Sequence, residues 1–283
     1  MNDQAGVECG ACQHWASDRA GQVDFHLPHR DIKATVWRCA FCGTYIQDAN
    51  LDDPAIRHHF DIASYTAPAM EANWRRLRTD FFKWIIKVSR HHLGRPLSGC
   101  HALDIGIAYG IMMELLREEG AEAEGVEIVT ALQAAVRSRG FIVHDRIEQA
   151  SDHRQDLVFA IDSFYYLNDP SRSLTAIRSL MAPDGVLAMR LANRAWYFDF
   201  VRKLGQEVAA KRFGDLKYFY TERGARLLLA RAGFQVERIY WTDRGRHDPR
   251  RLESIFYKLA PLANYLSPVR ISPGMLVIAR PAA

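Results

Sequence analysis

Short apolar runs and amphipathic segments alternate along the chain from residue 99 to its end. Runs rich in Val, Ile, Leu and Ala predict strands, whereas apolar side chains three and four positions apart predict helices. Strands are expected at residues 101–106, 122–127, 141–144, 156–161, 185–191, 234–241 and 274–280. Helices are expected at residues 109–119, 130–139, 170–181 and 221–232. This alternation predicts an α/β domain over residues 98–283, with helices on both faces of a parallel sheet.

Residues 51–97, which precede this domain, have the pattern of helices. Asp52 and Asp53 stand before Pro54, and proline is favoured as the first residue of a helix. A longer helix is expected over roughly residues 69–92, because large apolar side chains recur there at spacings of three and four. These side chains are Trp74, Leu77, Phe81, Trp84, Ile85 and Val88. We interpret the segment as a helical linker or cap that packs on the main domain.

Four cysteines near the N-terminus form two Cys-x-x-Cys pairs, Cys9 with Cys12 and Cys39 with Cys42. Each pair places two sulfur atoms on one tight turn, and two such turns can surround one metal ion as in structural zinc sites. Two disulfides are the alternative, but the paired spacing favours a metal, and disulfides are rare in cytosolic proteins. We therefore predict a zinc-ribbon module in residues 1–50, with the four cysteines as ligands of a structural zinc ion.

Composition and charge narrow the class of protein. The chain has 283 residues, is 48% hydrophobic and carries a formal net charge of +4. Residues 190–283 contain 18 basic and 8 acidic residues, whereas residues 1–189 contain 19 basic and 25 acidic ones. The basic part could attract an anionic substrate or a nucleic acid, but we favour a solvated arginine-rich surface. No apolar run has the length of a secretory signal or a membrane span, so we expect a cytoplasmic protein without a membrane partner.

The turn after the first predicted strand of the main domain suits a nucleoside ligand. Residues 103–110 read Leu-Asp-Ile-Gly-Ile-Ala-Tyr-Gly, and Ile111 stands where a dinucleotide-binding turn has its third glycine. Asp104 would repel a pyrophosphate and suits a ligand that bears an ammonium and a sulfonium group. Glu127, at the end of the second strand, can accept hydrogen bonds from both hydroxyls of a ribose. Together these residues favour S-adenosylmethionine over a dinucleotide.

With these motifs the chain resembles class I S-adenosylmethionine-dependent methyltransferases, in particular the group similar to ubiquinone-biosynthesis methyltransferases. The resemblance covers about residues 60–280. Residues 103–110 resemble the first motif of the family, 156–170 its fourth-strand motif, 181–187 its turn into the fifth strand, and 216–234 the approach to the sixth. The resemblance implies a Rossmann-like sheet of seven strands with helices on both faces, and S-adenosyl-L-methionine as the cofactor.

The resemblance also assigns residues to the cofactor. Glu127 matches the ribose-binding acid, His144-Asp145 matches the site that meets the adenine amino group, and Ala108 stands where the family has a glycine or another small residue. The predicted cofactor-binding residues are Asp104, Gly106, Ile107, Ala108, Gly110, Glu127, Ile128, Asp145, Arg146 and Asp162.

Tyr165 and Tyr166 depart from the family, which often has Glu-His at these positions. Two phenols bind hard cations poorly and are weak bases near neutral pH, since their ordinary pKa is about 10. This substitution disfavours a catalytic metal ion. The two tyrosines are our candidates for catalytic residues, and packing against a helix is the alternative.

The acceptor site is expected in the variable parts of the fold. The candidate substrate residues are Tyr65, Trp196, Tyr220 and Tyr257, the last in an amphipathic helix predicted over residues 249–266. These residues could line a pocket for an aromatic or anionic small molecule, or they could belong to covering helices. We predict methyl transfer to oxygen, nitrogen or carbon of a small metabolite. An RNA methyltransferase is one alternative and a non-catalytic cofactor-binding protein is another, while the sequence specifies no oligomeric state.

Overall fold

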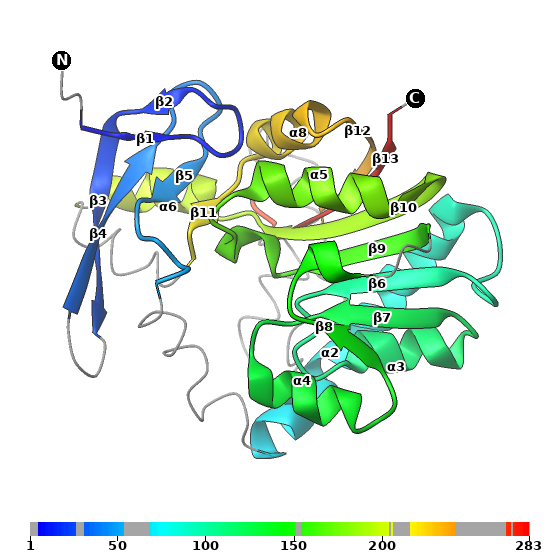
Figure 1. The fold of residues 1–283 in the computed structure, drawn as a ribbon. Coiled ribbons are helices and arrows are strands. Elements are labelled where there is room, and N and C mark those ends of the chain that lie inside the picture. The colour runs from blue at the N-terminus through cyan, green and yellow to red at the C-terminus, as the bar shows by residue number, and fades with distance from the viewer. Residues whose placement is uncertain are drawn as a thin grey trace.

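The computed structural model of the chain describes residues 5–26, 31–53, 68–150, 154–203, 205, 216–241, 270–272 and 274–282. A large sheet covered by helices stands beside a small sheet built mainly from N-terminal residues (Figure 1). Within these ranges, no helix combines the length and the apolar character needed to cross a membrane.

The large sheet has seven strands, and each overlaps a range expected from the sequence. They are β6 (His101–Ile105), β7 (Glu122–Val126), β8 (Ile142–His144), β9 (Gln155–Ile161), β10 (Met181–Ala192), β12 (Phe234–Tyr240) and β13 (Gly274–Pro281). Their order is β12-β13-β10-β9-β6-β7-β8. β13 runs antiparallel to both of its neighbours, and the other pairs are parallel. The predicted seven-stranded α/β sheet is confirmed, with one antiparallel strand that the alternation of elements did not reveal.

The order of the strands reverses between β6 and β9. β7 and β8 follow β6 on one side, whereas β9 pairs with the other side of β6. Ligands of such sheets bind at the carboxyl ends of the strands next to the reversal. The residues that follow β6, β7 and β9 are therefore the place to look for a site.

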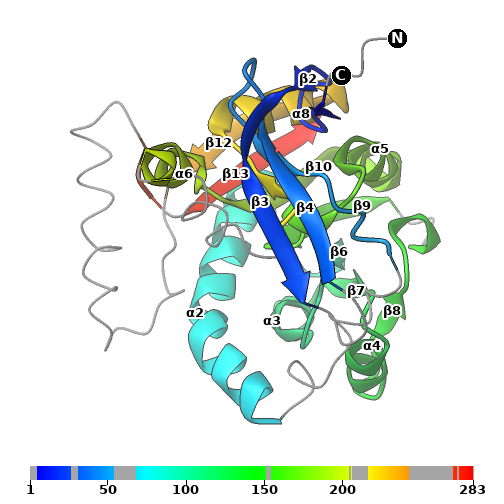
Figure 2. The ribbon, with the colours of Figure 1, turned by 90° about the vertical axis from the view of Figure 1, so that its left-hand side faces the viewer.

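Helices cover both faces of the large sheet. They are α2 (Pro68–Leu93), α3 (Ile111–Glu118), α4 (Thr130–Arg137), α5 (Pro170–Leu180) and α8 (Glu222–Arg231), whereas α6 (Ala195–Arg202) packs against the small sheet, where the ring centroids of Phe198 and Tyr45 are 5.0 Å apart. α2 and α3 share one apolar cluster with Leu157 and Phe159 of β9, and α5 and α8 share another with Val158 and Ala160 (Figure 2). Alternate side chains of β9 thus enter opposite cores, as expected for a strand that is buried on both faces.

Residues 5–53, as far as they are described, form the cysteine module. In it β1 (Val7–Glu8) pairs with β2 (Trp15–Ala16), and β3 (Asp18–His26), β4 (Asp31–Arg38) and β5 (Tyr45–Gln47) form an antiparallel sheet. The fourth strand of that sheet is β11 (Tyr218–Phe219), which pairs with β5 from far along the chain. One apolar cluster extends from Cys9 in the module to Met189 in β10. The module and the α/β domain therefore share a core.

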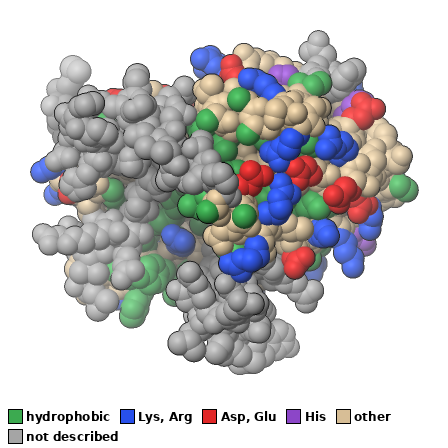
Figure 3. All heavy atoms as spheres, turned by 90° about the horizontal axis from the view of Figure 1, so that it is seen from below, with side chains coloured by type: hydrophobic (Ala, Val, Ile, Leu, Met, Phe, Trp, Pro, Cys, Tyr) green, Lys and Arg blue, Asp and Glu red, His purple; other side chains and the backbone are tan. Residues whose placement is uncertain are grey.

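Charged side chains of both signs are mixed on the described surface seen from below (Figure 3). Pairs such as Arg75 with Glu114, at 2.6 Å, and Arg90 with Glu119, at 2.7 Å, link α2 to α3 and its C-terminal end. Single exposed pairs of this kind contribute little stability. On the described part of this face, no large patch carries one sign of charge.

Candidate functional site

The glycine turn after β6 holds its backbone in conformations that side chains rarely adopt. Gly106 has a φ of +80° and Ala108 a φ of +47°. The amide of Gly106 donates a hydrogen bond to the carbonyl of Val126 at 2.8 Å, which ties the turn to the end of β7. A Cβ atom on Gly106 would lie 2.6 Å from the Cβ of Ser163 in the loop after β9. Glycine is required here both by the left-handed backbone and by this close approach.

Ile107 and Gly110 complete the turn in different ways. Ile107 is buried and packs with Met113 and Val136 in a small cluster, so its side chain supports the turn from beneath. Gly110, with a φ of +69°, precedes α3, and its amide donates to the carbonyl of Ile107 at 2.8 Å. The predicted turn residues are thus together, but Ile107 offers only its backbone to the edge of the sheet.

Glu127, the first residue after β7, turns its carboxylate onto the glycine turn. Its Oε2 accepts a hydrogen bond from the amide of Ala108 at 2.9 Å. Its Oε1 accepts from the amides of Ile128 and Val129 at 2.9 and 3.0 Å. The carboxylate therefore stabilises the left-handed Ala108 and lies where the sequence predicts a ribose-binding acid.

Asp104, in β6, is a carboxylate with only 4% of its surface exposed. Within the described part of the chain, no donor makes a hydrogen bond with it. Burial, together with repulsion by the Glu127 carboxylate, raises the pKa of Asp104 to about 7. A cation beside a buried carboxylate favours its charged form. This position is thus suited to a positively charged group of a ligand.

The next strand ends hold the other predicted cofactor residues. Ile128, 55% exposed, presents a large apolar side chain beside Glu127. Asp145 and Arg146 follow β8, and both of their amides donate to Oε1 of Gln149, at 3.0 and 3.1 Å. The Asp145 carboxylate is largely exposed and lies 3.4 Å from Nη2 of Arg137. These side chains occupy the same edge of the sheet as Glu127, since β7 and β8 are neighbours.

Asp162, at the end of β9, is held by two arginines that sequence reasoning missed. Its φ is +63°, and its carboxylate accepts hydrogen bonds from Arg78 of α2, at 2.9 Å, and from Arg190 of β10. Arg190 is 2% exposed. One signal was available, because Arg190 interrupts the otherwise apolar run of residues 186–192. In this arrangement the carboxylate of Asp162 serves ion pairs, and its role toward a cofactor stays a prediction.

Tyr165 and Tyr166 lie in the short 3₁₀ helix η2 (Phe164–Tyr166) of the loop after β9. Tyr165 is buried and its ring centroid lies 4.9 Å from that of Tyr166, which is partly exposed. The two phenols are therefore packed together in the loop whose Ser163 faces Gly106. A catalytic role for either phenol stays a prediction.

Of the four predicted acceptor residues, the structure describes Trp196 and Tyr220. Tyr65, Tyr257 and the helix expected over residues 249–266 lie outside the described residues. Tyr220 is 1% exposed and stacks on Tyr218 with a centroid separation of 5.2 Å. Trp196 lies in α6, and its buried indole N–H has no hydrogen-bond partner among the described residues. A buried donor without a partner marks this position as one where a polar group could bind.

The four predicted metal ligands come together in the cysteine module. All four sulfur atoms lie within 4.8 Å of one another, and all four residues are buried. Cys9 Sγ lies 3.6 Å from Cys42 Sγ, and Cys12 Sγ lies 3.5 Å from Cys39 Sγ. A tetrahedral zinc ion with Zn–S bonds of about 2.3 Å requires sulfur separations of roughly 3.8 Å. The hydrogen bond with Cys42 raises the pKa of the Cys9 thiol, and burial adds to this, so four thiolates here need a cation.

Two similar turns carry these cysteines. The amide of Gln13 donates to the carbonyl of Cys9 at 2.7 Å, and the amide of Gly43 donates to the carbonyl of Cys39 at 2.8 Å. Gln13 and Gly43 both have left-handed backbones, with φ of +60° and +76°. Glycine adopts this conformation readily, so Gly43 fits its turn, whereas the residue type of Gln13 gives no such signal.

The family model described as a methyltransferase domain matches residues 69–239. The ubiquinone biosynthesis O-methyltransferase of Salmonella paratyphi A is 26% identical over 165 residues, which cover 51% of this chain and 66% of that protein. The matched segment therefore spans slightly less than two thirds of this relative.

Two solved structures share the fold. The 1,6-didemethyltoxoflavin-N1-methyltransferase of Burkholderia thailandensis has a TM-score of 0.54 at 16% identity, and the match covers 92% of this chain and 100% of that one. The magnesium protoporphyrin IX methyltransferase of Synechocystis PCC 6803 has a TM-score of 0.51 at 14% identity, over 80% and 99% of the two chains. Because the matched domain spans more than half of its residues, the chain belongs to the methyltransferase domain family.

Proposed function

We propose that this protein is an S-adenosylmethionine-dependent methyltransferase that acts on a small molecule. One observation carries the proposal: a buried carboxylate, Asp104, and a second carboxylate, Glu127, meet beside a left-handed glycine turn. A ligand that joins positive charge to a ribose satisfies both groups. The relatives named above support this reading, because their names describe methyl transfer to small molecules.

The residues present fit S-adenosylmethionine better than a dinucleotide. Its ammonium and sulfonium groups would stabilise the ionised form of Asp104, whereas a pyrophosphate would bring further negative charge to two carboxylates. Ile128 offers apolar surface to an adenine ring. The residues that we assign to the cofactor are Asp104, Gly106, Ala108, Gly110, Glu127 and Ile128.

When bound, this cofactor supplies a methyl group that its sulfonium has already activated. The protein then has to hold donor and acceptor in line and to exclude water. The loop after β9 is suited to this task because Ser163 packs directly against Gly106. Tyr165 and Tyr166 on this loop, together with Trp196, are the residues that we propose for contact with the acceptor.

The proposed metal is a structural zinc ion bound by the four cysteines. The sulfur separations, the burial of all four residues and the similar geometry of the two turns support a closed site. A closed site has no open position for a substrate, so the ion would act on folding rather than on the reaction.

Titration calorimetry tests the cofactor. S-adenosylmethionine and S-adenosylhomocysteine are expected to bind the folded, ligand-free chain at one site with micromolar or tighter affinity, whereas NAD⁺ as a control should not bind. Absence of binding by both adenosyl compounds would refute the proposal. Turnover is then followed as S-adenosylhomocysteine released with panels of phenols, amines and carboxylic acids.

Elemental analysis tests the metal independently. The purified chain is expected to contain one zinc ion and to show five reduced cysteines by mass spectrometry under denaturing, thiol-blocking conditions. A metal-free protein that has lost four protons to two disulfides would contradict the zinc site.

A further inference from the structure

The loop over residues 162–169 connects β9 to α5 and forms one wall of the glycine turn. Its first residues reach Gly106, where an added Cβ would lie 2.6 Å from Ser163. Its last residue, Asp169, begins α5 by accepting a hydrogen bond from the amide of Arg172 at 2.9 Å. A displacement of this loop would therefore move the wall of the proposed transfer site.

Lys217 binds the middle of this loop to the cysteine module. Its amide donates to the carbonyl of Tyr165 at 2.9 Å, and its own carbonyl accepts from the amide of Gln47 at 3.0 Å. Its Nζ donates to the carbonyl of Ala49 at 2.5 Å, and the residue is only 8% exposed. The side chain of Gln47 adds a bond of 2.6 Å to the carbonyl of Leu216. Residues 216–217 thus lie between η2 and β5 and bond to both.

Asn168 binds the end of the loop to the same module. Its Oδ1 accepts from the amide of Leu51 at 3.0 Å. Its Nδ2 donates to Oδ1 of Asn50 at 2.8 Å and to Oδ2 of Asp52 at 2.5 Å. Its carbonyl accepts from the hydroxyl of Tyr218 at 3.1 Å. Asn168 therefore bonds to the segment after β5 through its side-chain amide, and to β11 through its backbone carbonyl.

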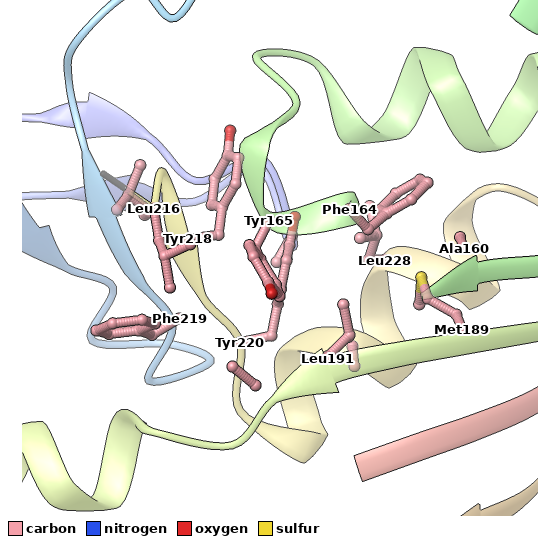
Figure 4. Packing of buried hydrophobic residues seen from close by; sticks show 14 of the residues in the cluster. Ala160, Phe164, Tyr165, Met189, Leu191, Leu216, Tyr218, Phe219, Tyr220 and Leu228 are labelled. Atoms are coloured by element: carbon pink, nitrogen blue, oxygen red, sulfur yellow. The ribbon is translucent and has the colours of Figure 1, made fainter. Parts of the chain in front are cut away.

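The same strand reaches the cysteine turns. A Cβ on Gly10, between Cys9 and Cys12, would lie 2.7 Å from the hydroxyl of Tyr218. The hydroxyl of Thr221 donates to the carbonyl of Cys42 at 2.5 Å. Figure 4 shows Tyr165 of η2 beside Tyr218 and Tyr220, with which it shares one buried cluster. Contacts therefore run without interruption from both cysteine turns to the loop.

We propose that the cysteine module positions the loop after β9, with Asn168 and Lys217 as the positioning residues. This inference rests on the proposed function, because the loop forms one wall of the proposed methyl-transfer site. In this view the metal site does not take part in the reaction. It fixes β5 and β11, and these strands hold the loop that carries Ser163, Tyr165 and Tyr166.

Hydrogen exchange followed by mass spectrometry on the full chain tests the proposal. Asn168→Asp removes the two side-chain donors and places a carboxylate against Asp52, so amide exchange in residues 163–168 should accelerate about tenfold or more. The double variant Asn168→Asp with Asp52→Asn restores a donor and an acceptor with exchanged roles, and it should return exchange toward the wild-type rate.

A matched control separates loop anchoring from general loosening of the module. Asp18 forms a bidentate ion pair with Arg202 of α6, at 2.9 and 3.0 Å, away from the loop. Asp18→Asn breaks this other contact between module and domain, and it should leave exchange in the loop unchanged. Tyr218→Phe, which removes one hydroxyl, gives a milder form of the Asn168 effect if Asn168→Asp does not fold.

The outcomes distinguish this proposal from the proposed function. Unchanged loop exchange in Asn168→Asp, equal acceleration in Asp18→Asn, or no recovery in the double variant would each overturn the positioning role. Calorimetry with S-adenosylmethionine is run on the wild type in parallel, because cofactor binding tests the proposed function whereas loop exchange tests the positioning role. If the wild type failed to bind S-adenosylmethionine, the proposed function would be refuted, whereas the exchange result on the loop would still hold.

Discussion

Replacing Asp104 by Asn tests whether a cationic ligand is the missing partner of this buried carboxylate. In the chain without ligand, the charge on Asp104 has no described donor and is repelled by Glu127. Asparagine has nearly the same shape without the charge. We therefore expect Asp104→Asn to stabilise the ligand-free protein and to weaken its binding of S-adenosylmethionine.

The size of the stabilisation follows from the pKa. Burial raises the pKa of Asp104 from 3.8 to about 7, which corresponds to a free-energy cost on the order of 4 kcal/mol for the ionised group. Because the pKa is raised in the folded state, this cost is absent below pH 3.8, grows as the pH rises and is complete above about pH 7. The variant should therefore gain on the order of 4 kcal/mol over wild type at pH 8, and about 1.5 kcal/mol at pH 5.

Chemical denaturation at pH 5 and pH 8 measures this difference, with Asp145→Asn as the control because the side chain of Asp145 is 61% exposed. The decisive quantity is how the difference in free energy of unfolding between variant and wild type changes with pH, because a packing defect in the variant would shift this difference equally at both pH values. An equal difference in free energy of unfolding at the two pH values would refute the assigned pKa. Calorimetry adds the second arm: wild-type affinity for S-adenosylmethionine should rise as the pH passes through about 7, and the affinity of the variant should be low and flat.

Three further predictions follow from the same site and from the module. Glu127→Gln should weaken S-adenosylmethionine binding by about 1.5–3 kcal/mol, whereas Glu122→Gln, at the exposed start of the same strand, should not alter the titration. Gly106→Ala should lower the free energy of unfolding by more than Gly140→Ala, because both have a φ near +80° but only Gly106 faces a close neighbour; equal losses in denaturation would remove the argument for the approach of Ser163. Chelation of the zinc ion should lower the melting temperature of the whole chain in a single calorimetric transition, because the module and the domain share an apolar cluster, and two separate transitions would contradict this.

Local pattern was enough to predict the large sheet. β6, β9 and β13 are mainly apolar runs bounded by turn residues, and the hydrophobic pattern of an interior strand is tightly constrained because both of its faces are buried. The cysteine turns were predictable for a similar reason, since the spacing of two thiols on a tight turn is itself a geometric requirement. What these predictions share is that their physical cause lies within about ten residues of the chain.

The features that were missed have partners that are distant in sequence. β11 has two residues, too few for any periodicity, and its pairing with β5 depends on the arrival of residues 218–219 beside residues 45–46. The resemblance assigned Asp162 to the cofactor, but it gave no sign of the two arginines that pair with this residue, because they come from α2 and β10. Contacts of this kind are set by tertiary packing, so no window of the sequence contains them.

The distant contacts are also the ones that join the two proposed sites. A zinc ribbon on a flexible linker would leave the loop after β9 to the α/β domain alone. Here β11 completes the sheet of the module, and Lys217, the residue before it, holds the carbonyl of Tyr165. The hydrogen bonds of Asn168 hold the other end of the same loop. Because Leu216 and Tyr218, the chain neighbours of Lys217, share one buried cluster with the cysteines and with Tyr165, disorder in the metal site has a direct structural route to the wall of the proposed transfer site.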